Sequence, residues 1–319
     1  MIHLDAQSIS TLVDTPTAVR HIGAVLRSGY DPERDSARLF SSLPDGEFLI
    51  MPTAAGRYCG TKVLTLAPSN PSRGLPKIQG MYVLFDADTL APLATLDGVE
   101  LTLIRTPSVT TLAVSHLLER RRPHRDGRSS VGRLVVFGTG PQAHRHIDAF
   151  AAVFTLEDIV VVGRTQDKAH RFIDARPEGG RIRAGSASDV AGADLVLCAT
   201  SSATPLFSSD LVSDETVVAA IGSHGFDARE LDPTLVRRSH VYVEARASAL
   251  REGGNLIPAR TIDEWKSRPL PNIADLVNGD AFIPEVGPLV YNGIGMSWED
   301  VVVASHCFEV ASSRTPSTL

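Results

Sequence analysis

Short, continuous apolar runs in the second half of the chain constrain its fold more than any other feature of the sequence. Stretches with helical spacing separate most of these runs. Runs of Val, Ile and Leu without polar alternation are typical of a parallel sheet that helices cover on both faces. The pattern therefore predicts an α/β fold with a Rossmann-type, doubly wound parallel sheet, an architecture that binds nucleotides. The predicted strands are residues 133–138, 158–163, 194–200, 216–222 and 240–245.

A glycine motif follows the first of these runs. Gly138, Gly140 and Ala143 form a G-x-G-x-x-A pattern between the predicted strand and a helix. Gly138 permits a tight turn, Gly140 lets the backbone approach a pyrophosphate, and Ala143 is small enough for the helix to pack on the strand. The pyrophosphate would lie at the unsatisfied N–H groups of the helix N-terminus. Because the motif stands between an apolar strand and a helix, it favours dinucleotide binding over a tight turn without a ligand.

The residues after the second run indicate which nicotinamide cofactor would fit. An NAD site has a carboxylate there, which accepts a hydrogen bond from the ribose 2′-hydroxyl. This chain has Gly163, Arg164 and Thr165 instead, and Asp158 lies at the opposite end of the strand. A guanidinium and a hydroxyl suit a 2′-phosphate, because Arg binds phosphate through charge-assisted, forked hydrogen bonds. We therefore expect NADP(H); the alternative is that Arg164 is an ordinary solvated arginine.

The first part of the chain has a different pattern. Residues 5–27 carry apolar side chains at helical spacing, whereas residues 46–105 alternate β-rich stretches with turn residues. Residues 86–92 fit the connection of a hairpin. This region is predicted to be α+β with a largely antiparallel sheet. Residues 106–121 then read as one helix with a threonine start, and residues 297–311 as a last helix that could pack on the first region.

Length, composition and charge exclude several classes of protein. An apolar share of 43% and a charged share of 21% are typical of a folded protein, and 319 residues predict two domains. The net charge of −6 argues against a nucleic-acid partner, and the dense basic run at 120–128 reads as a solvated loop between domains. The sequence has no 18-residue apolar run and no signal-peptide pattern, so we expect a cytoplasmic protein without a membrane partner.

Cysteines and histidines predict neither disulfides nor a metal site. The three cysteines are widely spaced, and Cys198 falls inside a predicted buried strand, where it would be a small core residue. His144 and His146 are two residues apart on a predicted helix and would point to different faces. No cysteine or acidic residue near them has the spacing of a metal ligand.

Three motifs together resemble the ornithine cyclodeaminase/μ-crystallin family, in its ketimine reductase-like branch. They are RTPSVTTLAV at 105–114, GTGPQAHRHIDAF at 138–150 and AIGSHGFDARELDP at 220–233. The resemblance implies a Rossmann domain and an α+β domain through which the chain forms a homodimer. We expect residues 1–118 and 298–319 to form the substrate-binding and dimerisation domain, and residues 119–297 to form the NADP-binding domain.

The resemblance also implies a site for a small-molecule carboxylate. Arg38, Lys62 and Arg105 occupy the family positions that hold the substrate carboxylate, and Lys62 could also donate a proton. Taken singly, each of the three reads as a surface charge, and only the family match assigns them a ligand. Ile294 is expected beside the substrate. The expected cofactor-binding residues are Lys77, Arg105, Gly138, Gly140, Pro141, Gln142, Arg164, Thr165, Thr200, Ser201, Gly222 and Gly293.

Two positions depart from the cyclodeaminase pattern of the family. Leu49 stands where that pattern has a glutamate, and His224 stands where it has the aspartate that serves as acid and base. Cyclodeamination needs a carboxylate base for its amine chemistry, so these departures argue against it. His224 could donate or relay a proton near neutral pH, or it could only line the site. Asp227, three residues later, looks structural.

These residues predict an NADPH-dependent reductase of a carboxylate-bearing imine, an enzyme of amino-acid metabolism. Cyclic ketimines such as Δ1-pyrroline-2-carboxylate or Δ1-piperideine-2-carboxylate would fit. The closest alternative is an amino-acid dehydrogenase, alanine dehydrogenase-like or opine-type, that forms its imine from an oxo acid and ammonia or an amine. An ornithine cyclodeaminase and a non-catalytic, NADPH-dependent binding protein are further alternatives.

Overall fold

The structure, a computed structural model, describes residues 1–121, 130–176, 180–223, 225 and 227–314. Within it the chain forms two compact units. The first unit is Met1–Val109 with Met296–Leu319, and the second is Thr110–Gly295. The assignment of substrate binding to one unit and NADP binding to the other remains a prediction. Residues 122–128 of the basic run lie outside the described residues.

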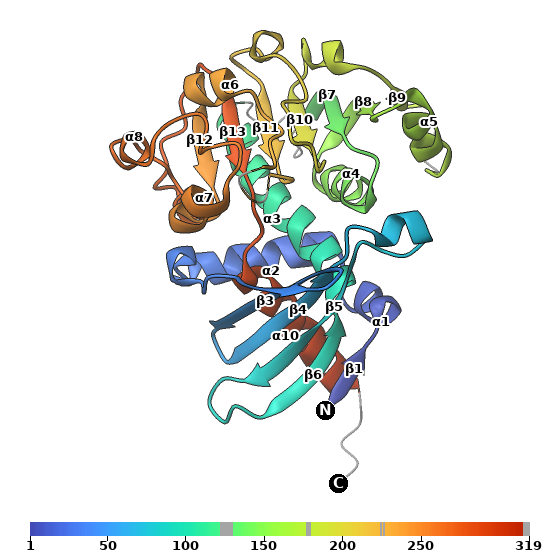
Figure 1. The fold of residues 1–319 in the computed structure, drawn as a ribbon. Helices are drawn as coiled ribbons and strands as arrows, with labels where there is room; N and C mark the ends of the chain where they lie inside the picture. Colours follow the sequence, from blue (N-terminus) through green and yellow to red (C-terminus); the bar gives the residue numbers. More distant parts are fainter. Residues whose placement is uncertain (122–129, 177–179, 224, 226, 315–319) are drawn as a thin grey trace. The chain divides into compact units, whose positions relative to one another are not determined.

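A mixed, six-stranded sheet forms the first unit among the described residues (Figure 1). Its order is β1 (Ile2–Leu4), β6 (Pro92–Asp97), β5 (Ile78–Asp86), β4 (Tyr58–Leu66), β3 (Gly46–Ala55) and β2 (Leu39–Leu43). The β1–β6 pair is parallel and the other neighbouring pairs are antiparallel, so the prediction of a largely antiparallel sheet is confirmed. Strands β5 and β6 form an antiparallel pair that is connected by residues 87–91, which confirms the predicted hairpin.

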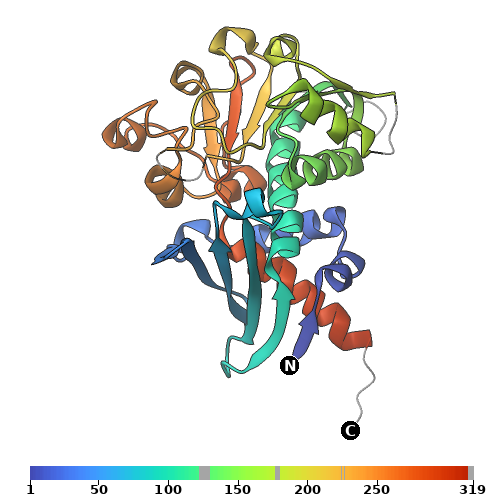
Figure 2. The same cartoon turned by 45° about the vertical axis from the view of Figure 1, so that its right-hand side comes forward.

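Helices cover one face of this sheet. Helix α10 (Ser297–Arg314) packs on β3, β4 and β5, and α2 (Thr15–Arg27) packs on α10. Figure 2 shows α10, in red, behind these strands. The helical pattern at residues 5–27 forms two helices, α1 (Ala6–Leu12) and α2, because Asp14 caps the second one by accepting a hydrogen bond from the N–H of Thr17.

The helix expected at residues 106–121 begins earlier than the sequence predicts. Helix α3 spans Gly98–Arg121 and includes Pro107. Its start is fixed by Asp97, whose carboxylate accepts hydrogen bonds from the N–H groups of Val99 and Glu100 at 2.9 and 2.8 Å. The residues after Asp97 have a strand-like composition, but the hydrogen bonds of this cap stabilise the start of a helix. Arg105 therefore lies on a helix, and the predicted β-rich character of 98–105 is wrong.

A parallel sheet forms the second unit, with seven strands among the described residues. Its order is β12 (His240–Val243), β13 (Leu289–Asn292), β11 (Val217–Ala220), β10 (Leu195–Cys198), β7 (Ser130–Phe137), β8 (Thr155–Val162) and β9 (Ile182–Ala184). Every residue of β10, β11 and β13 is buried, as expected for a sheet covered on both faces. The doubly wound α/β fold is confirmed. The sequence did not predict β9 and β13, which are short.

The remaining helices connect or flank the strands of the two units. In the second unit they are α4 (Pro141–Val153), α5 (Gln166–Asp174), α6 (Pro233–Arg238), α7 (Arg246–Glu252), α8 (Ile262–Lys266) and α9 (Ile273–Asn278). Short 3-10 helices lie at Pro32–Arg34, Asn70–Arg73, Ala187–Val190 and Ser209–Leu211. No helix in the described part of the chain is long and apolar enough to cross a membrane.

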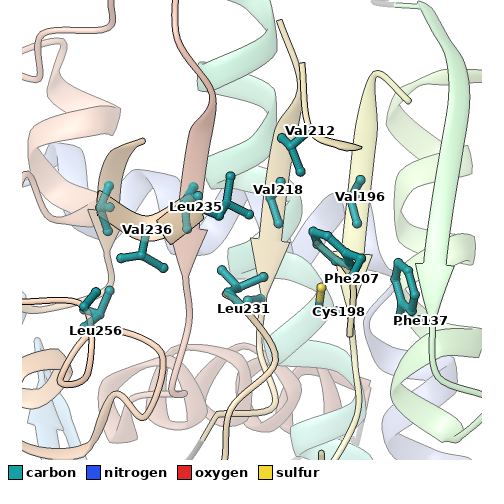
Figure 3. Close-up of a cluster of buried hydrophobic side chains, with 14 of the residues drawn as sticks. Phe137, Val196, Cys198, Phe207, Val212, Val218, Leu231, Leu235, Val236 and Leu256 are labelled. Atoms are coloured by element: carbon teal, nitrogen blue, oxygen red, sulfur yellow. The ribbon is translucent and has the colours of Figure 1, made fainter. Parts of the chain in front are cut away.

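An apolar core lies on one face of the second sheet. Figure 3 shows Val196 and Cys198 of β10 beside Val218 of β11. The rings of Phe137 and Phe207 lie 5.1 Å apart in the same cluster. Cys198 is fully buried in this core, which confirms its expected role as a packing residue. The core fixes the carboxyl ends of the strands that carry the candidate site.

Candidate active site

The turn between β7 and α4 has the geometry of a phosphate cradle. Gly138 has a φ of +117°, and a Cβ there would lie 2.4 Å from the carbonyl oxygen of Ala199, so this position requires glycine. Gly140 is the N-cap of α4, and in the described structure no side chain caps this helix and no atom would meet a Cβ at Gly140. The N–H groups of Ala143 and His144 donate to the Gly140 carbonyl at 3.0 and 3.3 Å, so the N–H of Gln142 is the one at the open start of α4 that faces a possible anion.

Two neighbours of Gly140 complete this turn. Pro141 opens α4 at a position where its missing N–H costs no hydrogen bond. The Oε1 atom of Gln142 is buried and has no hydrogen-bond partner among the described residues. An open glycine, an uncapped helix and an orphaned buried oxygen fit a bound dinucleotide better than a closed structural turn.

The end of β8 lies beside this cradle. Strands β7 and β8 are parallel neighbours, and the N–H of Gly138 donates to the carbonyl of Val162 at 3.0 Å. Arg164 and Thr165 follow directly and are exposed, and the Thr165 hydroxyl caps α5 by accepting from the N–H of Lys168. Asp158 is engaged elsewhere, in hydrogen bonds with Arg133 and Arg183. Arg164, which is predicted to bind a 2′-phosphate, therefore follows the end of β8, where the ribose of a dinucleotide would lie.

A buried glutamate ties together the turns after β10 and β11. The N–H and the hydroxyl of Thr200 donate to Oε1 of Glu230 at 2.7 and 2.8 Å, and the N–H of Gly222 donates to its Oε2 at 2.7 Å. Burial raises the pKa of Glu230 to about 7, and these hydrogen bonds oppose the rise. The sequence did not single out Glu230. Its only signal was a carboxylate directly before the apolar Leu231.

The same polar network reaches β13. The amide oxygen of Asn255 accepts from the N–H groups of Glu230 and Leu231, and its amide nitrogen donates to Asn292 at 2.9 Å. Glu230 thus belongs to a set of hydrogen bonds that joins three adjacent strand ends of the second unit. The exposed Ser201 follows Thr200 at this edge.

Glu244 fixes the glycine-rich turn after β13. Its Oε2 accepts hydrogen bonds from the N–H groups of Ile294 and Gly295 at 2.9 and 2.6 Å. Gly293 donates to the carbonyl of Ala220 at 2.9 Å, and the Ile294 side chain is buried. The turn is therefore held rigidly, which suits a segment that lines a binding site. The roles of Gly293 and Ile294 in binding remain predictions.

The first unit contains a cluster of three cations, of which Lys62 and Arg105 are buried and Arg38 is half-buried. Lys62 lies on β4, Arg105 on α3, and Arg38 directly precedes β2. Lys62 is fully buried, and its Nζ donates to Asp300 Oδ2 at 2.7 Å and to Thr102 Oγ1 at 3.0 Å. The Nε atom of Arg105 donates to Asp300 Oδ1 at 3.2 Å. One carboxylate thus receives a different cation on each oxygen.

The charge of Lys62 reflects these neighbours. Burial and the positive charge of Arg105 lower the pKa of Lys62 to about 8, and Asp300 opposes this effect. The charge of Arg38 lowers the pKa further, so Arg38 is close enough to act on the same amine. The structure brings together the three cations that the family resemblance selected. Their role as a carboxylate clamp remains a prediction.

The sequence missed the carboxylates that face these cations. Glu299 and Asp300 lie in the first turn of α10, and Glu299 Oε2 accepts from Nη1 of Arg105 at 3.0 Å. Both side chains are fully buried. In the sequence these two acids stand at the start of an apolar helix. Acidic residues are common there because they interact favourably with the helix dipole, so their position did not indicate a site. Acids are therefore present near the cations, although the positions of Leu49 and His224 lack them.

The start of α10 is itself fixed by a half-buried acid. Asp35 Oδ2 accepts from the N–H groups of Ser297 and Trp298 at 2.7 and 3.3 Å, and its Oδ1 accepts from the Thr53 hydroxyl at 2.7 Å. Burial raises the pKa of Asp35 despite these bonds. These contacts hold the helix end that carries Asp300.

The remaining predicted residues lie as follows. Leu49 pairs with Leu64 across β3 and β4, next to the pair of Met51 and Lys62. Leu49, Met51 and Leu64 form an apolar cluster on the same face as Lys62. Lys77 is exposed directly before β5. His224 lies outside the described residues.

The described residues contain no group of three or more side chains that could hold a metal. His146 is buried, its Nδ1 lies 2.8 Å from the Gln142 carbonyl, and burial lowers its pKa to about 4. The His144 ring stacks on Phe172 at 3.8 Å. Both histidines therefore have packing roles.

The chain has a Rossmann-type unit with an open phosphate cradle and a second unit with buried cations. These two features define a class of dinucleotide-binding α/β proteins that handle small anionic substrates. Residues 16–315 match the ornithine cyclodeaminase/mu-crystallin family. The chain belongs to this family, which confirms the resemblance of its motifs.

Relatives extend over the length of the chain. It is 28% identical to a Delta(1)-pyrroline-2-carboxylate reductase of Bacillus cereus (strain ZK / E33L), over 98% of both chains. It is 30% identical to a Delta(1)-pyrroline-2-carboxylate/Delta(1)-piperideine-2-carboxylate reductase of Azospirillum brasilense, over 84% of this chain and 82% of that one. The Thermococcus litoralis Delta(1)-pyrroline-2-carboxylate reductase, solved with NADH and L-proline, has a TM-score of 0.85 and 23% identity, and the match covers 98% of both chains. That likeness supports the fold.

Proposed function

We propose that the protein is an NADPH-dependent reductase of cyclic ketimines that carry a carboxylate, such as Δ1-pyrroline-2-carboxylate or Δ1-piperideine-2-carboxylate. The coarser statement, an NAD(P)H-dependent oxidoreductase that acts on C=N bonds, rests on family membership and on relatives with this activity along the whole chain. The observation that carries the finer proposal is the cluster of the buried Lys62 and Arg105 with the half-buried Arg38. Asp300 and Glu299 supply two negative charges against these three cations, so a substrate carboxylate would balance the third positive charge.

In this proposal Lys62 both binds the substrate and moves a proton. The reduced nicotinamide, when bound, supplies a hydride to the imine carbon. The π electron pair of the C=N bond then resides on nitrogen, which takes the proton of the Lys62 ammonium, and Lys62 regains a proton from solvent. A lysine with a pKa of about 8 remains largely charged at neutral pH and gives up its proton more readily than an ordinary lysine. His224 is the alternative proton donor.

The apolar cluster beside Lys62 supports a ring substrate. Leu49, Met51 and Leu64 lie on the lysine's face of the sheet. A side chain that ends in a cation, such as that of ornithine, would lose hydration there without gaining a partner. A hydrocarbon ring would bury its surface at no such cost. We therefore propose cyclic or uncharged substrate tails over diamino acids.

For the cofactor we propose NADP(H), bound by the second unit. The pyrophosphate would lie on the N–H groups at the start of α4, with Gly138, Gly140, Pro141 and Gln142 around it. Arg164 and Thr165 would bind the 2′-phosphate, because no carboxylate occupies 163–166. The further proposed contacts are Lys77, Arg105, Thr200, Ser201, Gly222 and Gly293.

We also propose a cytoplasmic homodimer. Ile50, Val63 and Met81 lie in register on β3, β4 and β5, on the face opposite to Lys62 and α10. Met81 is 51% exposed. An apolar row on an open sheet face is suited to pack against the same face of a second copy.

The experiment that tests the proposed function is NADPH consumption with a panel of cyclic imines and of oxo acid and amine pairs. We expect the cyclic imines to give the largest kcat/KM. Faster turnover of an oxo acid with ammonia or an amine would favour the amino-acid dehydrogenase instead. A non-catalytic binding protein would not oxidise NADPH faster on addition of any imine.

A further inference from the structure

The contacts of Asp300 set it apart from the other acids of the first unit. Its Oδ2 accepts from Lys62 at 2.7 Å and its Oδ1 from Arg105 at 3.2 Å, and its side chain is fully buried. Glu299, the residue before it, accepts from Arg105. Asp300 is thus the carboxylate that directly joins the lysine to the arginine.

We infer that Asp300 is a positioning residue, which fixes the distance between Lys62 and Arg105 and keeps the amine of Lys62 charged for its part in imine reduction. The inference rests on the proposed function of Lys62. A carboxylate whose two oxygens bind two cations determines where both cations lie relative to each other. Asp300 does not need to touch the substrate for this role.

The position of Asp300 is well fixed by its surroundings. Asp35 caps the first turn of α10, which carries Asp300, through the N–H groups of Ser297 and Trp298. Helix α10 packs on β4, the strand of Lys62. Two elements that are far apart in the sequence, β4 and α10, therefore hold the ion pair. A small shift of α10 would change the distance between the Asp300 carboxylate and the amine of Lys62.

The groups that face Lys62 come from several elements. Arg105 and the Thr102 hydroxyl lie on α3, and Tyr82 is its cross-strand neighbour on β5. Arg38 acts on the amine from the segment before β2. Burial, Arg105 and Arg38 all disfavour the charged amine, and Asp300 is the acid that favours it. Loss of the charge of Asp300 would therefore release the proton of Lys62 at a lower pH.

The test is the pH profile of kcat/KM for Δ1-pyrroline-2-carboxylate in the wild type and in Asp300→Asn. We expect the alkaline limb of the profile to move to lower pH by about 1–3 units, the usual effect of one opposite charge at this distance. The imine itself titrates identically in all variants, so only the difference between proteins counts. A limb at the wild-type pH, or at a higher pH, would overturn the inference.

Two acid-to-amide changes on the same helix serve as comparisons. Glu299→Gln removes a carboxylate that acts on Lys62 through Arg105, so we expect a smaller shift than for Asp300→Asn. Glu309→Gln removes a carboxylate that binds the Tyr58 hydroxyl, and we expect the wild-type profile. A shift in Glu299→Gln as large as in Asp300→Asn would assign the effect to the general charge of the helix and contradict a specific role for Asp300.

Asp300→Glu keeps the charge and displaces the carboxylate. We expect the alkaline limb to remain at its wild-type pH while the KM for the imine rises, because the two cations are spread. If Asp300→Asn does not fold, this variant carries the test, and unchanged kcat and KM would overturn the positioning role.

A measurement without turnover separates this inference from the proposed function. If the wild type reduces no imine, the proposed function fails, but the charge of Lys62 is still readable from the protons taken up on unfolding near pH 8. An uncharged Lys62 takes up a proton when it is exposed. We expect greater uptake in Asp300→Asn than in the wild type, and equal uptake would contradict the inference.

Discussion

In the first unit the buried carboxylate of Asp300 faces two cations, whereas in the second unit the buried carboxylate of Glu230 faces neutral donors. The first arrangement holds charged groups in place for an anionic ligand. In the second, hydrogen bonds alone do not offset burial, and the pKa of Glu230 rises to about 7. Equal burial thus has different consequences, because the partners differ: one carboxylate organises cations and the other joins strand ends.

The largest effect is expected from removal of the lysine in the first unit. Lys62→Met should lower kcat/KM for a cyclic imine by about 10²–10⁴-fold, the usual contribution of a general acid. It also leaves Asp300 with one cation fewer. Steady-state kinetics would measure the loss, and NADPH binding followed by fluorescence would show that the second unit is intact. Lys266→Met, on α8, is the control, and a loss below about tenfold in Lys62→Met would contradict the assigned role.

The second prediction concerns Glu230 and pH. Its pKa in the folded protein, about 7, lies above its ordinary value of 4.5, so the native state binds an extra proton between these values. The contribution of Glu230 to stability should therefore fall by about 3 kcal/mol in total as the pH rises through this window, so the wild type should lose that much stability relative to Glu230→Gln. Glu230→Gln cannot titrate and should lack this loss.

Urea unfolding at several pH values between 4.5 and 7 would measure this difference. Glu215→Gln, which removes an exposed carboxylate, should retain the wild-type dependence. Parallel profiles for the wild type and Glu230→Gln would mean that Glu230 is charged throughout, and the contrast between the two units would be wrong.

The cofactor preference gives a third, smaller effect in the second unit. Arg164→Asp should flatten or reverse the preference for NADPH over NADH, at a cost to NADPH use of about 1–3 kcal/mol, the range of a charge-assisted hydrogen bond. The ratio of kcat/KM for the two cofactors measures it. Arg171→Asp makes the same charge change at an exposed position on α5 and should leave the ratio unchanged. An equal or better kcat/KM with NADH in the wild type would refute the NADP assignment.

The smallest effect is expected on the open sheet face of the first unit. Met81→Lys places a charge in the apolar row and should weaken the proposed homodimer by about tenfold, the effect of roughly 1.4 kcal/mol. Light scattering over a dilution series would measure the change. Phe282→Lys, at an exposed apolar residue of the second unit, is the control. A wild-type mass of about 34 kDa at micromolar concentration would exclude the dimer.

The sequence predicted best where its signals are local. The apolar runs and the Gly138 turn depend on residues that are neighbours in the chain, and the structure confirms the fold that they indicate. The start of α3 was missed because one hydrogen-bonding cap at Asp97 outweighs several residues of β-like composition. Strand β13 was missed because its four residues become a strand only between two neighbours in the sheet.

The candidate site depends more on contacts that are remote in the sequence. Family resemblance selected Lys62 and Arg105, yet their partner Asp300 lies more than 190 residues away from either. No periodicity links such positions, so the acids at the start of α10 read only as a helix end. Glu230 was missed for the same reason, because its partners Thr200 and Gly222 follow two different strands.

The central claim is that this chain reduces cyclic imines and does not cyclise ornithine. One paired measurement tests it: NADPH oxidation with Δ1-pyrroline-2-carboxylate, beside ammonia and proline formation from ornithine and NAD⁺. The apolar cluster at Leu49 and the engagement of Asp300 and Glu299 by cations predict rapid imine reduction and negligible ammonia release. Ammonia release from ornithine at a rate comparable to imine reduction, or no NADPH oxidation with any cyclic imine, would contradict the claim.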